Sequence, residues 1–581
     1  MEKTPKRRFT ADFETATWIE NETYVWHWGV SEIGNPSNTS WGIDIDDFMT
    51  WCKENSNSIV YMHNLKFDGE FILYYLLKHD YICINKEGKK AAKTFKTIIS
   101  DLGQFFCITI YFTTKKYIKI IDSLKIIPLP IKKIPGAFGL SERKLELEYE
   151  RERPKGYIPN QQEVDYLIND VVIPSKAINI MLDQGLSHMT CAGNAMGDYK
   201  QMLGKRGFDH FYPKLKPEVD ENIRKGYRGG FTYLNPIYAG LVVNNGYVLD
   251  VNSLYPSVMY NERLPIGEPK FFEGEYVQDD IYDLYIQQVT CMFDLKPGKI
   301  PTVQIKNDKR FRGNEYLTSS NYDEVSLTLT NIDLKLFKEN YEIYNIKYIG
   351  GWKFRSVRGL FCRYIDKWSG VKIEAKQTGN SGMYTISKLM LNSLYGRFGL
   401  SVKTRSKTPY LENEIVKYKT EPEEIRDGCY IPMATFITAY ARDKTIRTSQ
   451  KIKDYSIAHY GQDMYIYSDT DSIHTLLPKE ELLKICDIDD YRLGAWKIEN
   501  EFCRGKFIRQ KTYVEEIPGK GLKITCAGLP ADCYNQVTFD NFNENLKITG
   551  KLVYKHVVGG VKLVETTFKI GQNTFALFGG K

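Results

Sequence analysis

The segment GYVLDVNSLYPSVM, residues 246–259, changes from an apolar strand pattern to a helical pattern directly after Asp250. Far downstream, the segment YIYSDTDSIHTL, residues 465–476, predicts two strands joined by a tight hairpin turn that contains Asp469 and Asp471. Acidic residues are common in such turns for conformational reasons alone, so the hairpin by itself indicates little. Together with an acidic residue at the end of another apolar strand, it points to a shared carboxylate site.

Between these two segments lies KLMLNSLYGRFG, residues 388–399, which predicts part of a long helix over 386–398. Four of its residues recur with helical spacing and therefore share one face, namely Lys388, Leu391, Asn392 and Tyr395. An amphipathic surface helix would prefer leucine or isoleucine there, whereas lysine, asparagine and tyrosine suit the phosphates, sugar and base of a nucleotide. Lys372, expected on the preceding helix, is a further candidate phosphate ligand, although an exposed lysine is usually only solvated.

A separate acidic pair lies near the N-terminus, in FTADFET, residues 9–15. On a strand, Asp12 and Glu14 point to the same face about 7 Å apart, because alternate side chains share a face. Two like charges at that distance repel by roughly 2 kcal/mol at an effective dielectric constant of about 20, a cost that a bound divalent cation would reverse. The simpler explanation is a solvated strand face, which is the more common case for an isolated pair.

Two further segments contain acidic residues that can join this pair. In NLKFDGEF, residues 64–71, Asp68 lies near a predicted helix start, and in YLIND the residues Tyr166 and Asp170 share one helix face. A pair of Mg²⁺ or Mn²⁺ ions can generate a hydroxide, align it on a phosphodiester and stabilise the departing 3′-oxygen, while Tyr166 orients the water. The hard oxygen ligands that would hold these ions are Asp12, Glu14, Asp68 and Asp170.

Composition and absent motifs narrow the class of protein. The chain has 581 residues, and its 79 Lys and Arg against 72 Asp and Glu leave a net charge of +7 that suits a polyanionic partner without proving one. No glycine-rich loop ends in Lys-Ser or Lys-Thr, and neither G-x-G-x-x-G nor H-E-x-x-H occurs, which argues against P-loop ATPases, Rossmann dehydrogenases and zincins. Eleven scattered cysteines predict reduced thiols, and we expect no membrane span.

Residues 8–190 alternate between predicted strands and helices, which indicates a mixed α/β unit. A domain junction is expected near residue 190. Downstream, KGYRGGFTYLNP, residues 225–236, contains paired glycines that permit unusual backbone conformations, so we expect a linker that another group approaches closely. In the first unit the predicted strands are 8–14, 58–62, 105–112 and 117–122, and the predicted helices are 67–77 and 162–182.

The order of the three N-terminal motifs, D-x-E, N-x-x-F-D and Y-x-x-x-D, resembles that of the DEDD-type 3′–5′ exonucleases. Any one motif is weak evidence, but the ordered set is specific. The resemblance implies that the four acidic residues and Tyr166 are catalytic, and that Lys144 contacts the scissile phosphate. It also implies that a frayed single strand, with one base stacked on Phe67, is held by Thr15, His63, Asn64, Phe67, Ser123 and Leu124.

The segments around Asp250 and Asp471 resemble motifs A and C of family B DNA polymerases, and residues 388–399 resemble motif B. By this resemblance, Asp250 and Asp471 chelate two Mg²⁺ ions with help from the Val251 carbonyl, while Asp469 acts less directly. The reaction would be an in-line phosphoryl transfer from a deoxynucleoside triphosphate to the primer 3′-oxygen.

The same resemblance assigns the nucleotide and DNA contacts. Tyr255 takes the position that clashes with a 2′-hydroxyl and so favours deoxynucleotides. The residues implied for the triphosphate and the nascent base pair are Lys372, Lys388, Asn392 and Tyr395. Lys511 and Tyr513, expected on one strand face, resemble the K-x-Y motif that grips the primer terminus. The Y-x-G-G motif, whose backbone amides would reach template phosphates, comprises Tyr227, Arg228, Gly229, Gly230 and Phe231.

From Asp12 to about Lys569, the chain is identified as a member of the phi29-type bacteriophage DNA polymerases, the protein-primed branch of family B. This implies an α/β multidomain fold in which an RNase H-like DEDD exonuclease domain precedes a right-hand polymerase domain of palm, fingers and thumb with two insertions. The predicted boundaries are 1–190 for the exonuclease domain, 191–261 and 429–527 for the palm, 262–358 for insertion 1, 359–399 for the fingers, 400–428 for insertion 2, 528–570 for the thumb and 571–581 for a C-terminal tail.

The resemblance also implies a biological role. We expect a viral enzyme of the host cytoplasm, acting as a monomer, that replicates a phage genome with strand displacement and proofreading. Its expected cofactors are two Mg²⁺ ions per active site, with Mn²⁺ as an alternative. Its expected partners are primer-template DNA, single-stranded DNA, deoxynucleoside triphosphates and a terminal protein that contacts insertion 1, while insertion 2 encircles the template.

Two other hypotheses remain open at this point. A metal-dependent nuclease with a non-catalytic nucleic-acid-binding half would degrade single strands without incorporating nucleotides. A non-enzymatic single-strand binder would show salt-dependent affinity and no metal requirement, but it leaves the two ordered acidic sets unexplained.

Overall fold

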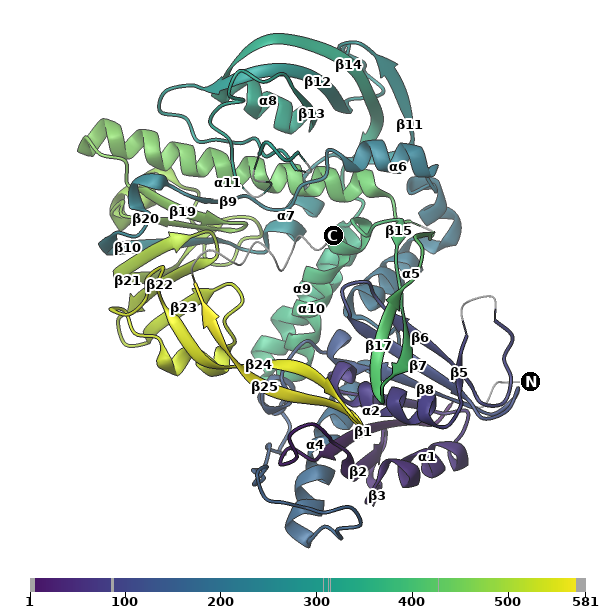
Figure 1. Cartoon of the computed structure of the whole chain (residues 1–581). Coiled ribbons are helices and arrows are strands. Elements are labelled where there is room, and N and C mark those ends of the chain that lie inside the picture. The colour runs from purple at the N-terminus through teal and green to yellow at the C-terminus, as the bar shows by residue number, and fades with distance from the viewer. Residues whose placement is uncertain are drawn as a thin grey trace.

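The computed structural model describes residues 6–84, 88–306, 308–311, 313, 315–426 and 428–570 (Figure 1). Its N-terminal part contains the strands β1 (Arg8–Thr15), β2 (Val25–Glu32), β3 (Asn35–Gly42), β4 (Ile59–Met62), β5 (Ile82–Cys83), β6 (Thr94–Ile99), β7 (Phe105–Tyr111) and β8 (Tyr117–Asp122). They form one eight-stranded sheet in the order β3-β2-β1-β4-β8-β7-β6-β5. The helices that pack on this sheet are α1 (Ile45–Glu54), α2 (Leu65–Lys78) and α4 (Gln161–Asp183).

The alternation of side chains along this sheet decides which residues meet which helix. Val60 of β4 belongs to the core that includes α1 and α2, whereas its neighbour Tyr61 belongs to the core that includes α4. On β1, Phe13 lies in the α1–α2 core. Thr10 points the other way, because its hydroxyl donates a 2.6 Å hydrogen bond to the carbonyl of Val171 on α4. Even-numbered positions of β1 therefore face α4.

A second sheet, called the central sheet below, has seven strands. Its strands are β9 (Thr232–Leu234), β10 (Val242–Val251), β19 (Tyr465–Asp469), β20 (Ser472–Thr475), β21 (Trp496–Arg509), β22 (Thr512–Ile517) and β23 (Gly521–Cys526). They lie in the order β23-β22-β21-β10-β20-β19-β9. The long helix α11 (Ile431–Tyr460) packs against β19 and β20, and it also contacts α10 (Ser381–Phe398), which pairs with α9 (Cys362–Thr378).

Smaller units interrupt or follow this sheet. The first consists of β11 (Leu264–Glu273), β12 (Leu284–Leu295), β13 (Val325–Thr330), α8 (Asn331–Asn340) and β14 (Tyr341–Val357), with strand order β11-β14-β12-β13. The second contains β15 (Lys403–Thr404), β16 (Lys407–Glu412), β17 (Ile415–Thr420) and β18 (Glu424–Ile425). The last is the hairpin of β24 (Lys547–Val557) and β25 (Gly560–Lys569), which reaches back to the first sheet (Figure 1).

The remaining helices connect these units. They are α3 (Ile134–Phe138), α5 (Cys191–Phe211), α6 (Pro217–Arg224), α7 (Leu254–Asn261) and α12 (Lys479–Ile485), together with the 3-10 turns η1 (Ser123–Lys125), η2 (Ile131–Lys133), η3 (Pro236–Tyr238) and η4 (Ala531–Gln536). None of the helices in the described ranges is both long enough and apolar enough to cross a bilayer. All eleven cysteine thiols are free.

Each strand and helix predicted in the first unit exists with ends within two residues of the prediction. The structure corrects the prediction of a linker at 225–236, because part of this segment forms β9, an edge strand of the central sheet. The paired glycines there do not adopt the left-handed conformation. Gly230 is needed for a different reason, since a Cβ atom at this position would lie 2.6 Å from the Thr470 hydroxyl. The predicted domain boundaries stay predictions, and the tail at 571–581 lies outside the described residues.

Candidate active sites

The acidic residues of the central sheet meet in one cleft. Asp250 is the penultimate residue of β10 and pairs in register with Ser472 of β20, which also pairs with Asp469 of β19. The turn between β19 and β20 is closed by Thr470 in the left-handed conformation, and it brings Asp471 beside Val251, whose N–H donates to the Asp471 carbonyl at 2.8 Å. The cleft has a volume of about 400 Å³ and is lined by Val248, Asp250, Asp469, Thr470, Asp471, Ser472, His474, Glu499, Lys511, Tyr513 and Lys523.

Lysines compensate two of these carboxylates. Lys497 Nζ lies 3.0 Å from Asp250 Oδ1, and Lys511 Nζ lies 2.7 Å from Asp469 Oδ1. Burial, followed by the charge of Asp250, raises the pKa of Asp471 to about 6. A positive charge next to Asp471, from a proton or a cation, is therefore favourable. The pattern of the sequence offered no signal for Lys497, because a lysine on a long polar strand resembles any solvated lysine.

The K-x-Y residues lie at the rim of the same cleft but not on one strand face, which corrects the prediction. Lys511 occupies the turn before β22 with a φ of 55°, and its N–H donates to the Tyr467 hydroxyl at 2.9 Å. Tyr513 lies within β22, where its ring stacks on Phe507 with ring centroids 5.2 Å apart. The tight turn lets the Lys511 ammonium reach Asp469, while Tyr513 forms part of the wall.

The helix α10 presents two of its predicted contact residues to solvent. Lys388 and Asn392 are exposed, whereas Leu391 is 4% exposed and belongs to the core. Tyr395 stacks on Tyr255 of α7, with ring centroids 3.9 Å apart and planes inclined by 24°. Burial and then, among its charged neighbours, Asp471 raise the pKa of Tyr395. The predicted sugar and base contacts are thus already paired, and they lie close to the acidic cleft.

The remaining predicted residues of this region are Lys372, Val251 and members of the Y-x-G-G segment. Lys372 lies on α9 and is partly exposed. Val251 is 1% exposed, and the role of its carbonyl as a metal ligand stays a prediction. Phe231 is fully buried and packs edge-on against Tyr316 with ring centroids 4.8 Å apart, so its side chain has a place in the core. Tyr227 is half-buried and lies against Gly399.

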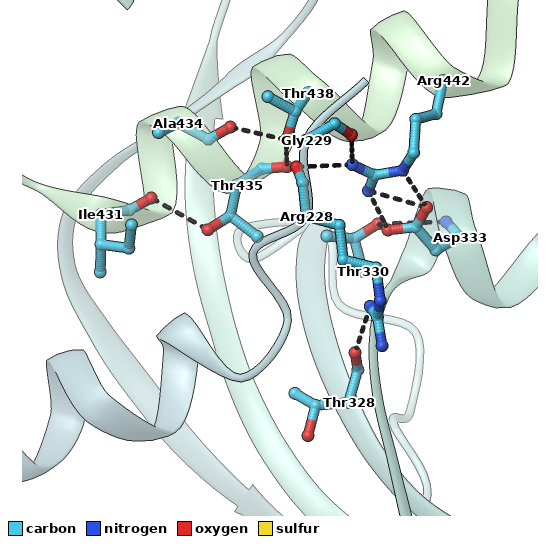
Figure 2. A network of polar contacts seen from close by, with 10 residues as sticks. All are labelled: Arg228, Gly229, Thr328, Thr330, Asp333, Ile431, Ala434, Thr435, Thr438 and Arg442. Atoms are coloured by element: carbon cyan, nitrogen blue, oxygen red, sulfur yellow. Dashed lines mark hydrogen bonds and ion pairs between the residues drawn. The ribbon is translucent and has the colours of Figure 1, made fainter. Parts of the chain in front are cut away.

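One arginine holds the backbone of the Y-x-G-G segment (Figure 2). Arg442 of α11 is 2% exposed, and its Nη1 donates to the carbonyls of Arg228 and Gly229, both at 2.8 Å. Its other nitrogens bind Asp333 of α8, with Nη2 2.8 Å from Oδ2. The Arg228 guanidinium in turn donates to the Thr328 carbonyl at 2.9 Å. These contacts fix the backbone path of the segment, and the contact of its amide N–H groups with template phosphates stays a prediction.

The second acidic set lies between the N-terminal sheet and α4. Asp12 and Glu14 stand at even positions of β1 and so face α4, where Tyr166 and Asp170 are each 1% exposed. Burial, and then the charge of Asp170, raises the pKa of Asp12 to about 7. Glu14 has a pKa well above the ordinary value because it is buried and close to Asp12.

The remaining members of this set are Asp68 and Lys144. Asp68 is 3% exposed in the first turn of α2, and burial followed by the charge of Asp12 holds its pKa well above the ordinary value. Lys144 lies in the loop before α4, and its Nζ is 3.0 Å from Asp170 Oδ2. The lysine predicted to contact a phosphate thus neutralises one carboxylate of the set in the free protein.

The donor chemistry of this set fits divalent cations. Asp68 Oδ1 and Asp170 Oδ1 are buried and accept no hydrogen bond, so they carry free lone pairs. Hard cations such as Mg²⁺ prefer carboxylate oxygens of this kind. Among the residues that the structure describes, however, no three His, Cys, Asp or Glu side chains converge as a ready-made metal site. The number of ions per site therefore stays a prediction.

Tyr149 is a site residue that the sequence did not reveal. Its hydroxyl lies 2.5 Å from the hydroxyl of Tyr166. A single tyrosine in a charged loop has no periodicity that could indicate this contact. The pair places two phenol groups beside Asp170, where they can position a water molecule or a phosphate oxygen.

The residues predicted to hold a single strand form a connected group at the end of β4. His63 uses both ring nitrogens, with Nδ1 3.0 Å from Ser123 Oγ and Nε2 2.8 Å from the Leu129 carbonyl. Burial lowers the pKa of His63 to about 4, so the ring is neutral. Asp122, which the sequence did not reveal, accepts hydrogen bonds from the N–H groups of Asn64 and Leu124. Ser123 is 1% exposed and therefore supports His63 from inside.

Asn64 and Phe67 meet a residue from the far end of the chain. Asn64 adopts the left-handed conformation, with a φ of 70°, and its Nδ2 donates to the Tyr554 hydroxyl at 3.1 Å. The ring of Phe67 lies 6.3 Å from that of Tyr554. Thr15 follows a register shift at the end of β1 and is partly exposed. The hairpin β24–β25 therefore contacts this group through Tyr554.

Comparisons with known proteins agree with this arrangement. A model of type B DNA polymerases from organelles and viruses matches residues 50–482. The DNA polymerase of Bacillus phage B103 is 41% identical over 97% of this chain and 100% of its own length, and that of Bacillus phage phi29 is 39% identical over 98% and 100%. A solved structure of phi29 DNA polymerase complexed with primer-template DNA and incoming nucleotide substrates has a TM-score of 0.90 at 38% identity, and the match covers 97% of this chain and 100% of that one.

Proposed function

The chain belongs to the type B DNA polymerases of organelles and viruses, within the phi29-type phage group, and from this premise we propose that it copies a phage genome from a protein primer while displacing the opposite strand. It is a DNA-directed DNA polymerase with an α/β exonuclease domain followed by palm, fingers and thumb. The family also carries a 3′–5′ exonuclease, and the acidic set beside α4 is our candidate for that second site.

The observation that carries the polymerase assignment is the single cleft that contains Asp250, Asp471 and the K-x-Y residues. DNA polymerases of this family use divalent metal ions, generally Mg²⁺, and a bound pair would lower the pKa of the primer 3′-hydroxyl and neutralise the triphosphate. We assign Asp250 and Asp471 as the carboxylates that hold these ions. The Lys511 ammonium would leave Asp469 and contact the primer backbone instead, because from the rim of the cleft it can reach either acceptor.

On the nucleotide side, Lys388 and Asn392 are exposed on α10 and free to receive the triphosphate and sugar. Lys372 would bind the same phosphates from α9. Tyr255 is held in place by the Tyr395 ring, so it can exclude a 2′-hydroxyl sterically instead of turning aside. Because the two rings support each other, removal of either would loosen the sugar pocket.

At the second site, Asp12, Glu14, Asp68 and Asp170 would hold the ions that activate water for phosphodiester cleavage. Tyr166 and Tyr149 would orient the water and the departing nucleotide through their paired hydroxyls. Lys144 would turn from Asp170 to the scissile phosphate once cations neutralise the carboxylates. Thr15, Asn64, Phe67 and Leu124 would hold the strand, supported by His63 and Ser123.

Protein priming and strand displacement are supported by the two inserted units. The four-stranded unit with α8 lies between motif A and motif B, and the hairpin β16–β17 lies between motif B and motif C. We assign the first to a terminal protein and the second to the template. The phage polymerases of B103 and phi29 match 97% and 98% of this chain over their whole length.

The priming proposal is tested without any oligonucleotide. Deoxyadenosine triphosphate and Mg²⁺ are offered with candidate terminal proteins, and covalent nucleotidylation of a hydroxyl is measured by gel. We expect labelled terminal protein with the native chain and none with Asp250→Ala. A strict need for an oligonucleotide primer would place the chain outside the protein-primed branch. The alternative of a nuclease with a non-catalytic half predicts no incorporation on primer-template DNA under any condition.

A further inference from the structure

Glu70 is a buried carboxylate that neither acidic set requires. It lies on α2 and is 2% exposed, although it stands between Gly69 and Phe71 in a segment that packs on the sheet. Burying a carboxylate is costly unless hydrogen bonds satisfy both oxygens. The partners of Glu70 therefore indicate what the residue does.

Those partners come from two distant parts of the chain. The hydroxyl of Tyr418, on β17, donates to Glu70 Oε2 at 2.7 Å. Nε2 of His556, on β24, lies 3.0 Å from Glu70 Oε1. The rings of Tyr418 and His556 also meet each other edge to face, with centroids 6.0 Å apart. One carboxylate thus joins α2, the hairpin β16–β17 and the hairpin β24–β25.

Apolar packing seals the same junction. Val416 of β17 is 2% exposed and Val561 of β25 is 1% exposed, and both belong to the core built on α1 and α2. Gly560 lets β25 approach α2 so closely that a Cβ atom there would lie 2.7 Å from the ring of Phe71. At the tip of that hairpin, the Thr23 N–H donates to the Val558 carbonyl at 2.9 Å. The hairpins therefore dock on α2, and they approach it from different sides (Figure 1).

The path of the chain turns this junction into a closed ring. In the chain, the hairpin β24–β25 follows the central sheet, while the hairpin β16–β17 lies between α10 and α11. Helix α10 packs on α11, and α11 packs on that sheet. Because both hairpins contact α2 and each other, the chain forms a ring whose closure depends on noncovalent contacts alone. Glu70 is the polar contact shared by all three elements.

We propose that Glu70 is a positioning residue that fastens the two hairpins to the exonuclease domain, so that the ring stays closed around bound DNA during synthesis. This rests on the proposed template-encircling role of the hairpin β16–β17. Glu70 makes no contact with the reacting groups of the polymerase cleft, so its loss acts on retention of DNA and not on nucleotide addition. The bound partner is the template DNA assigned above to the hairpin β16–β17.

The experiment separates retention from chemistry. The full-length chain is first bound to a primed single-stranded circle. Synthesis is then started together with excess heparin, which traps any polymerase that dissociates. The product length per binding event is measured. Single-nucleotide incorporation is measured in the same preparations by rapid quench, and thermal unfolding reports on folding. The variants are Tyr418→Phe, His556→Phe, Glu70→Ala and Glu70→Gln, with Tyr410→Phe on the exposed strand β16 as a matched control.

We expect Glu70→Ala to shorten the products about tenfold, and Tyr418→Phe and His556→Phe about threefold each, because each variant removes hydrogen bonds to a charged group. Incorporation of a single nucleotide stays within about twofold of the native rate. Glu70→Gln retains long products, because its amide can accept from Tyr418 and donate to a neutral His556. Tyr410→Phe behaves as the native chain.

Two results would overturn the proposal. Native product lengths with both Tyr418→Phe and His556→Phe would show that the junction does not hold DNA, even if Glu70→Ala fails to fold. Equal losses in product length and in single-nucleotide incorporation would show a general structural role. If the native chain itself stops after a few nucleotides, the template-encircling function fails instead, which is a distinct outcome.

Discussion

The two acidic sets use the same residue types in opposite electrostatic settings. In the central cleft, Lys497 and Lys511 pair with Asp250 and Asp469, and the site opens to solvent. Beside α4, the carboxylates are more deeply buried and share Lys144, which contacts Asp170. Two carboxylates of the first site are therefore paired with lysines before any cation binds, whereas the second set has one lysine and depends more on cations to relieve its own repulsion.

The largest expected effect tests whether the two sets are independent. Asp250→Ala or Asp471→Ala should lower primer extension at least about a thousandfold, which corresponds to roughly 4 kcal/mol of barrier. Degradation of single-stranded DNA by the same variants should change less than about twofold. Extension assays and strand-degradation assays with Mg²⁺ check this prediction, and near-normal extension by both variants would contradict the metal assignment.

The converse variants act on the other site. Asp12→Ala or Asp68→Ala should reduce strand degradation by about a hundredfold or more, because an ion loses a buried ligand, while single-nucleotide extension is retained. The measurement is release of labelled 3′-nucleotides in parallel with extension. Parallel loss of both activities would mean that the sets are structurally coupled.

A smaller effect concerns stability without metal. Asp68→Asn should stabilise the protein in EDTA by on the order of 1 kcal/mol, because it removes a buried charge whose pKa is raised by burial and by Asp12. The melting temperature should rise by about 2 °C. Asp250→Asn, which leaves Lys497 without its partner, should give no such gain. Equal shifts in the melting temperature of the two variants, measured by calorimetry, would contradict the electrostatic difference between the two sites.

The smallest expected effect is a dependence of folding stability on pH. An acid with a raised pKa binds more protons in the folded state than in the unfolded state, so stability falls as pH rises between the two pKa values. With Asp12 at about 7 and Asp471 at about 6, the metal-free protein should lose stability from about pH 4 up to about pH 7. Asp12→Asn should flatten this slope more than Asp471→Asn. Saturating Mg²⁺ should also flatten it, and denaturant melts at several pH values check both.

Local patterns predicted much of each site. Period-two alternation placed Asp12 and Glu14 on one face of β1, and helical spacing placed Tyr166 and Asp170 on one face of α4. The tight turn at Thr470 brought Asp469 and Asp471 together as predicted. These succeeded because strand and helix geometry repeat over a few residues. The strand assignment of Lys511 was wrong because a single residue with positive φ moved the turn.

Contacts between distant segments could not be predicted in this way. The hydrogen bond from Asn64 to Tyr554 spans 490 residues, and that from His556 to Glu70 spans 486. Similarly, Lys497, Tyr149 and Arg442 carry no local pattern that marks their partners. Such pairs depend on how whole sheets and hairpins dock.

The amino-acid order alone therefore indicated the members of the two acidic sets and the elements that present them, since strand and helix geometry repeat over a few residues. Only the tertiary structure decided which lysine neutralises which carboxylate, and how Glu70 joins two hairpins to α2. The physical reason is that packing and buried ion pairs are set by shape complementarity between segments hundreds of residues apart.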